Sequence, residues 1–165
     1  MKKALLFAVA GLAAVVTVVV TAERSVANPR CHHLIGFGGI QSSAVTAGCT
    51  SPVGLCTAGQ FHGDPLLHGT TAFSADGLAP AAGMPAVEAP TTLSYSGLLT
   101  ITTSFGTLTT RDTGIFDTAA GLFSSRDVIV GGTGIFAGAT GHLFFSGTGT
   151  TTFNSTALGE ICLAP

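Results

Sequence analysis

The sequence predicts an all-β protein folded as a closed antiparallel barrel of about eight strands. After residue 27 no segment repeats its apolar residues with a helical period, and Thr, Val, Ile and Phe dominate instead. Glycine interrupts these runs every few residues, and short, evenly spaced runs of this kind are typical of a sandwich or a barrel. Closure removes the exposed strand edges through which a chain so rich in Thr and Val would aggregate. The barrel is therefore the favoured architecture.

Residues 1–27 are predicted to be a signal peptide, which is removed on export. Lys2 and Lys3 are followed by an apolar run over residues 4–22, and Ser25 and Ala27 provide the small residues that signal peptidase needs. An uncleaved anchor is the alternative, because the apolar run is nearly long enough to cross a bilayer. We expect a secreted or periplasmic protein with an N-terminal arm at 28–40, a single barrel domain at 41–165, and no membrane partner after cleavage.

The strands follow one another along the rest of the chain. Weaker strands are expected at 43–50 and 69–75, then a long strand at 91–105, and further strands at 107–112, 121–130, 142–149 and 150–156. The Pro- and Ala-rich segment 76–90 is predicted to be a loop that covers one mouth of the barrel. The expected core includes Leu99, Ile101, Phe116, Leu122, Phe136 and Leu143.

A short internal repeat indicates two successive hairpins. TGIFDTAAG at 113–121 matches TGIFAGATG at 133–141 in its Thr, Gly, Ile, Phe and final Gly. In such a hairpin the Phe enters the core, and glycine adopts a positive φ in the turn. Two copies are too few for a solenoid, so they are interpreted as successive hairpins of one sheet.

Four cysteines remain after residue 27, and an even number in an exported chain predicts two disulfides. Cys49 and Cys56 flank a loop with Pro and Gly that would bring them together. Cys31 and Cys162 lie near opposite ends of the chain, which a closed barrel places side by side. This pairing is favoured among the three possible connectivities. Metal binding by these thiols is not expected, because there is no C-x-x-C pair.

The charge content excludes several classes of protein. Only 8% of the residues are charged and the formal net charge is −2, which does not fit a nucleic-acid binder, an acidic tail, a coiled coil or a chain disordered by charge. After residue 27 the cations are Arg30, Arg111 and Arg126. There is no nucleophile elbow and no recognisable Ser-His-Asp arrangement.

Two Arg-Asp dipeptides are the weak candidates for catalysis: Arg111-Asp112 and Arg126-Asp127. Adjacent strand residues point to opposite faces, so each dipeptide places one charge inside the barrel and one outside. Arg111 with Asp127, or Arg126 with Asp112, would form a cross-strand salt bridge that fixes the register. Alternatively, one Arg and one acid in an apolar lumen would stabilise an oxyanion and transfer a proton.

Three further residues are candidates for ligand binding. Tyr95, the single tyrosine, and Glu88, near the end of the Pro-rich loop, would line a mouth of the barrel. His142 opens a predicted strand, and either faces a cavity or caps the strand end.

No metal or other cofactor is expected. His62, Asp64 and His68 are spaced as H-x-D-x3-H, which fits neither one helical face nor strict alternation, and Pro65 interrupts it. These are interpreted as loop histidines, as are His32 and His33 near the N-terminus. The segment 127–138 imitates the glycine pattern of a dinucleotide site, but strand and turn residues follow it where that site needs a helix.

The segment RDVIVGGTGIFAGATGHLFFSGTGT at 126–150, preceded by TGIFDTAAGLFSS, resembles the signature of the allene oxide cyclase-like, or dirigent-like, barrel superfamily. Residues 131–141 are its most specific part, and the similarity extends over about 93–162. The segments CTSPVGLCTAG and GEIC resemble the exported bacterial branch. The resemblance implies a calycin-like barrel of eight antiparallel strands with an apolar cavity, often dimeric or trimeric. No catalytic residue of the family is placed on this chain by it.

Two classes of function follow from these features. One is an exported barrel that binds a small hydrophobic molecule, or simply a stable secreted barrel. The other is an isomerase or cyclase that folds a hydrophobic substrate in the lumen, where confinement needs few reactive side chains. The ten phenylalanines after residue 27 suit an apolar cavity as well as a filled core. The scarcity of acids and bases favours binding over catalysis.

Overall fold

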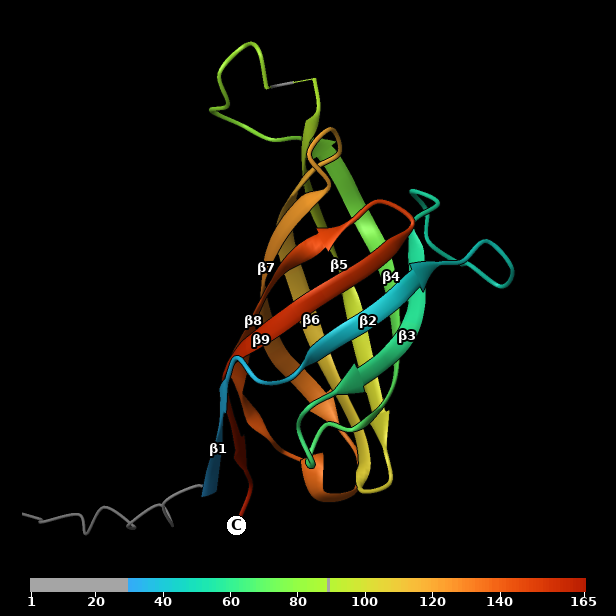
Figure 1. The fold of residues 1–165 in the computed structure, drawn as a ribbon. Helices are drawn as coiled ribbons and strands as arrows, with labels where there is room; N and C mark the ends of the chain where they lie inside the picture. Colours follow the sequence, from blue (N-terminus) through green and yellow to red (C-terminus); the bar gives the residue numbers. More distant parts are fainter. Residues whose placement is uncertain (1–29, 89) are drawn as a thin grey trace, which may run out of the picture.

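The fold was analysed in a computed structural model, which describes residues 30–88 and 90–165. Its single antiparallel sheet closes on itself because β9 pairs with β8 on one side and with β2 on the other (Figure 1). The strands are β1 (Arg30–Ile35), β2 (Gly39–Ala44), β3 (Cys56–His62), β4 (Gly69–Pro80), β5 (Thr92–Thr103), β6 (Gly106–Asp117), β7 (Leu122–Gly132), β8 (Thr140–Gly149) and β9 (Thr152–Leu163). Eight strands form the barrel and β1 is additional, which confirms the predicted fold class. The predicted signal peptide and its cleavage site lie outside the described residues.

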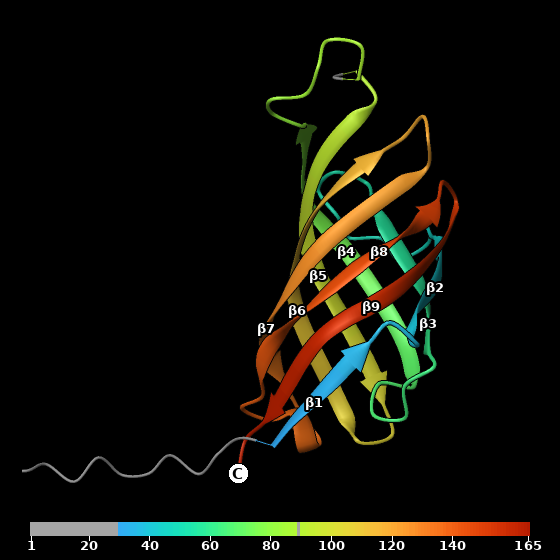
Figure 2. The same ribbon diagram turned by 60° about the vertical axis from the view of Figure 1, so that its left-hand side comes forward.

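Strands β1 and β2 share one edge of β9 (Figure 2). β1 pairs with the C-terminal part of β9, where Cys31 lies opposite Cys162, and β2 pairs with its N-terminal part, where Gln41 lies opposite Asn154. The chain turns between them at Gly36, whose φ of 88° favours glycine. Most of the predicted N-terminal arm is therefore part of the sheet.

Most observed strands differ from the predicted ones at their ends, but the strand predicted at 43–50 is wrong, because β2 ends at Ala44 and residues 45–55 form a connection. β3 was not predicted, β4 continues to Pro80 so that the loop is 81–91, and β9 is longer than expected. The second copy of the internal repeat is not a simple hairpin, because its Phe136 lies in a short 3-10 helix, η1 (Gly134–Phe136). Phe136 is fully buried, whereas Phe116 of the first copy is half-buried at the other end of the barrel.

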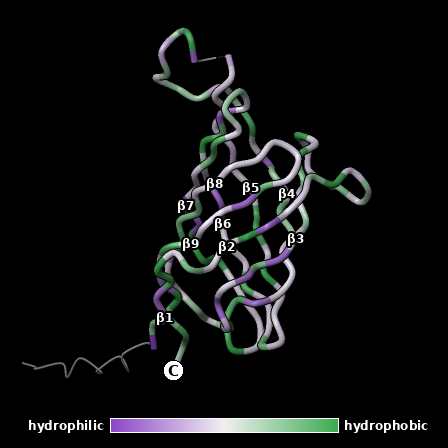
Figure 3. The backbone as a smooth tube through the Cα atoms, in the orientation of Figure 1, coloured by the Kyte–Doolittle hydropathy of each residue, from purple (hydrophilic) through white to green (hydrophobic). Residues whose placement is uncertain are grey.

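The barrel has two different ends. The upper end, at the top of Figure 1, carries the connections 45–55, 81–91, 118–121 and 150–151. The lower end carries 63–68, 104–105 and the segment with η1. The hydropathy colours of Figure 3 show no strongly hydrophilic belt along the strands. The lower half of the lumen is filled by fully buried apolar side chains: Phe61, Leu67, Ile101, Leu108, Phe136, Leu143 and Ile161.

Most of the predicted core residues are confirmed, but Leu122 is not. Leu99, Ile101, Phe136 and Leu143 are buried, whereas Leu122 is 53% exposed. Its neighbour Phe123 faces the cavity instead, since successive residues of a strand point to opposite faces.

Both disulfides are present with the favoured connectivity. Cys31 is bonded to Cys162 and Cys49 to Cys56. The first fastens β1 to β9, and the second closes the loop that leads into β3. No helix within the described part of the chain is long and apolar enough to span a membrane.

Candidate functional site

The upper half of the lumen holds a cavity of about 100 Å³ with a largely aromatic and aliphatic wall. It lies above the packed lower core and below the loops of the upper end. The lining residues are Ile40, Ser42, Leu55, Thr57, Phe73, Leu78, Tyr95, Leu99, Asp112, Phe116, Phe123, Ser125, Phe145, Phe153 and Ser155. Among the described residues that line the cavity there is no Lys, Arg or His. Asp112 is the one acidic residue among them.

The register of β6 and β7 places two carboxyls side by side on the inner face. Asp112 lies directly opposite Asp127, and both are buried, with 8% and 0% of their surface exposed. Directly opposed side chains on neighbouring strands approach closely, with Cβ atoms roughly 5 Å apart. Toward the upper end the next inward pair is Gly114 with Ser125, and the pair after it is Phe116 with Phe123. The carboxyls therefore form a polar layer between the aromatic wall above and the apolar core below.

The two carboxyls differ in their hydrogen bonds. Asp127 accepts one from the Thr110 hydroxyl at 2.5 Å and one from the Ser125 hydroxyl at 3.0 Å. Among the described residues, Asp112 Oδ1 is buried and has no hydrogen-bond partner. A buried acceptor without a partner is rare in folded proteins and is costly. Asp112 also lines the cavity.

Burial raises the pKa of both carboxyls, because a charge is poorly solvated in the apolar lumen. Burial and then the negative charge of Asp127 raise the pKa of Asp112 to about 8. Burial raises the pKa of Asp127 to about 6, against the lowering effect of the hydrogen bonds from Thr110 and Ser125. The two groups titrate as a pair, and near pH 7 the pair holds about one proton.

Tyr95 enters the same cavity from β5, and two glycines make room for the rings beside it. A Cβ atom on Gly114 would lie 2.6 Å from the Tyr95 hydroxyl, and one on Gly97 would lie 2.5 Å from the Phe73 ring. The rings of Tyr95 and Phe73 meet edge to face, with their centroids 6.0 Å apart. Burial first, and then the charge of Asp112, raise the pKa of Tyr95 well above its ordinary value. Tyr95 is therefore a neutral phenol that can donate a hydrogen bond.

Neither arginine of the two dipeptides lies in the lumen. The alternation was predicted correctly, but both arginines are on the outer face and both aspartates on the inner face. Arg111 is bonded through its guanidinium to Asp76 of β4, with Nη2 2.9 Å from Oδ1, and Arg126 is exposed.

The register explains why the predicted cross-strand ion pairs do not form. Arg111 lies opposite Val128, and Arg126 lies opposite Thr113, so neither arginine meets the acid of the other strand. The lumen therefore contains two acids, Asp112 and Asp127, and not the expected combination of one Arg and one acid.

The other candidate ligand-binding residues lie outside the cavity wall. Glu88 is exposed in the loop 81–91. His142 is on the outer face of β8, opposite Val128 and Glu160, and its ring contacts that of Phe144 at 5.3 Å. Only Tyr95 of the three lines the cavity.

The histidines of the lower end are engaged locally. His32 Nε2 lies 2.7 Å from Asp64 Oδ2, while Asp64 Oδ1 accepts hydrogen bonds from the backbone of Leu66 and Leu67. His62 and His68 stack edge to face with ring centroids 5.9 Å apart. The contact between His32 and Asp64 ties β1 to the β3–β4 connection.

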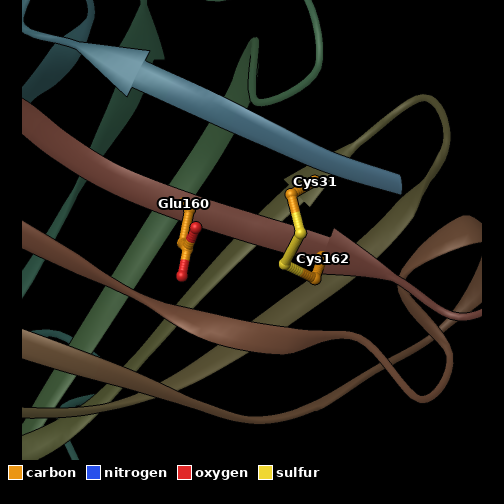
Figure 4. A group of neighbouring side chains, drawn as sticks. All are labelled: Cys31, Glu160 and Cys162. Carbon is orange, nitrogen blue, oxygen red and sulfur yellow. A yellow bond between two sulfur atoms is a disulfide. The ribbon is translucent and has the colours of Figure 1, made fainter. Parts of the chain in front are cut away.

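One group in the described chain brings together three residues whose side chains can bind metals: Cys31, Glu160 and Cys162 (Figure 4). Both sulfurs are consumed in the disulfide. Metals bind the thiolate form of cysteine, so this group lacks the sulfur ligands of a metal site.

Thr110 and Ser125 were not singled out from the sequence. Each lies two residues from an aspartate on the same strand, and both hydroxyls are bonded to Asp127. The alternation of side chains along β6 and β7, which places Leu108 and Ile129 in the core, would have predicted that they point inward. The same alternation places Thr110, Asp112, Ser125 and Asp127 on the inner face.

The chain was compared with models of protein families, with curated proteins and with solved structures, and no match was found in any of the three.

Proposed function

We propose that this protein is an exported barrel that binds a small hydrophobic molecule in the upper half of its lumen. The observation that carries the proposal is a cavity with a mostly apolar wall that also holds a buried polar atom without a partner, Asp112 Oδ1. Ligand sites are commonly apolar pockets with a few convergent polar groups, and the Tyr95 and Ser125 hydroxyls provide two more here. The resemblance of residues 126–150 to the allene oxide cyclase-like superfamily, and of the segments CTSPVGLCTAG and GEIC to its exported bacterial branch, supports the same assignment.

The size of the cavity limits the ligand. A cavity of 150 Å³ lined by apolar side chains is large enough for benzene. The volume of about 100 Å³ here is smaller, so the cavity suits a short alkyl chain or part of one ring, and the rest of the ligand is directed to the upper end. The two disulfides and the closed sheet keep this cavity in a rigid frame.

A titration with 2-phenylethanol tests the proposal. Tyr95 is the only tyrosine and tryptophan is absent, so the intrinsic fluorescence reports on the cavity alone. We expect saturable quenching or enhancement of this emission. Ser42→Leu, which projects into the cavity, weakens binding, whereas Ser43→Leu on the outer face of the same strand does not. No saturable signal with any small aromatic or alkyl compound contradicts the proposal.

A second candidate function is an isomerase or cyclase, and the carboxyl pair favours it. At neutral pH the pair offers a carboxylic acid beside a carboxylate, which are the groups that general acid and base catalysis use. Paired carboxyls with separated pKa values recur in such sites. Conversion of an unsaturated epoxide, followed by chiral chromatography, tests this function. Turnover that is lost in both Asp112→Asn and Asp127→Asn supports it, and equal rates with and without protein contradict it.

A further inference from the structure

We propose that the ligand of this cavity carries a cationic amine beside its apolar part, and that the lumen discriminates against carboxylates. The inference rests on the proposed binding function and names the chemical class of the ligand. The charged side chains that point into the barrel are acidic. The polar layer of the lumen contains Asp112 and Asp127, whereas Arg111 and Arg126 are both on the outer face.

The unpaired oxygen defines where the amine binds. Asp112 Oδ1 is buried and has no partner among the described residues, and Asp112 lines the cavity. An ammonium group at this point donates to Asp112 and neutralises the buried charge of the carboxyl pair. Such charge-assisted hydrogen bonds are about twice as strong as neutral ones.

The remaining wall suits a cation as well. Tyr95 and the rings of Phe73, Phe116, Phe123, Phe145 and Phe153 surround the cavity. Aromatic faces attract cations through their quadrupole, and cages of such rings are a known way to hold quaternary and methylated ammonium groups. An anion, in contrast, meets two acids and the negative ring faces, with no cation in the described lining.

A metal ion fits this site less well. Ca²⁺ requires six to eight oxygen ligands, and Mg²⁺ requires near-octahedral oxygen geometry. The described lumen offers the two carboxyls and a few hydroxyls within an otherwise apolar wall.

Three probes of the same shape test the inference: 2-phenylethylamine, 2-phenylethanol and phenylacetate, each titrated into the disulfide-bonded protein at pH 7. We expect the amine to bind roughly 10-fold more tightly than the alcohol, since a hydrogen bond to a charged group contributes more than a neutral one by about 1.4 kcal/mol. We expect phenylacetate to bind more weakly than the alcohol.

The carboxyl pair predicts a second signature. Because burial and the charge of Asp127 raise the pKa of Asp112 to about 8, an ammonium that pairs with the Asp112 carboxylate at pH 7 displaces up to about one proton. Calorimetry of amine binding in buffers of different ionisation enthalpy measures this release. The alcohol is expected to release none.

Two variants separate the role of Asp112 from a general effect on the fold. Asp112→Asn is expected to lose the preference for the amine, so that its affinity for the amine falls to that for the alcohol. Glu160→Gln, an acid on the outer face of β9, is expected to keep the preference. Alcohol binding by Asp112→Asn shows at the same time that the variant is folded.

The outcomes distinguish the two proposals. If the alcohol binds as tightly as the amine, or if Asp112→Asn retains the preference, the amine inference is overturned and the binding function stands. If none of the three probes binds, the binding function itself fails. Amine binding that depends on Asp112 and releases a proton supports both.

Discussion

Asp112 and Asp127 are held in the barrel in surroundings that favour their protonated forms. Burial raises the pKa of both above the value of 3.8 for a solvated aspartate. The folded protein therefore holds more protons than the unfolded chain between about pH 4 and pH 8. Unfolding releases these protons, so the free energy of unfolding decreases as the pH rises through this window and levels off above it.

This residue-scale effect predicts a stabilising substitution. At pH 9 we expect Asp112→Asn to raise the free energy of unfolding by at least about 2 kcal/mol, because a neutral amide replaces a buried charge. At pH 4 we expect wild type and variant to agree within about 1 kcal/mol. Urea unfolding at both pH values provides the measurement, with Glu160→Gln, an acid on the outer face, as the control. Parallel pH profiles for wild type and Asp112→Asn would contradict the prediction.

Gly114 has a steric role that its position in a strand does not reveal. An added Cβ would lie 2.6 Å from both the Tyr95 ring and the Ser124 carbonyl oxygen. We expect Gly114→Ala to displace Tyr95, to alter the single-tyrosine fluorescence and to destabilise the protein by about 1–3 kcal/mol. Gly131→Ala is the matched control, because nothing lies within 4 Å of an added Cβ there. Equal stability of the two variants would show that the Tyr95 ring moves aside without cost.

At the scale of elements, β1 depends on its pairing with β9 and on the disulfide between them. The Cys31–Cys162 bond joins residues separated by 131 positions, whereas Cys49–Cys56 spans 7. In the chain-entropy model a longer closed loop restricts the unfolded state more strongly. The first bond is therefore expected to contribute more stability than the second.

Replacing each disulfide by a pair of serines tests this expectation. We expect Cys31→Ser with Cys162→Ser to lower the free energy of unfolding by up to about 5 kcal/mol, and Cys49→Ser with Cys56→Ser by about 2 kcal/mol. Thermal unfolding of both variants beside wild type is the measurement. A larger loss from the short loop would indicate that the packing of Cys56 outweighs loop entropy.

At the scale of the whole molecule, export and oxidation are linked. Both disulfides agree with folding in an oxidising compartment. When the full-length chain is expressed with its N-terminal segment in a host that exports it, we expect the mature protein to begin at Asn28. Its intact mass should lie about 4 Da below that of the reduced form, because each disulfide removes two hydrogens. A product that retains residues 1–27, or that can be alkylated at two or more cysteines without reduction, would contradict this.

The sequence by itself determined the fold class, the alternation of the charged dipeptides and the favoured cysteine pairing. These depend on local signals: the content of Thr, Val, Ile and Phe, the period of two along a strand, and the need of a closed barrel to bring its ends together. The resemblance of 126–150 to a barrel family pointed to the same architecture. Local signals left open which face of each strand turns inward.

The tertiary structure decided the faces and the register. A shift of one residue turns every side chain of a strand to the other side of the sheet, which is why Leu122 was expected inside and is exposed. The pairing of β6 with β7 places Asp112 opposite Asp127, where the dipeptides alone suggested arginine opposite aspartate. Register depends on the packing of both strands against the whole core, because only the closed barrel buries Leu108 and Ile129 together. The two acids of the candidate site therefore meet through long-range packing, which no single segment of the sequence contains.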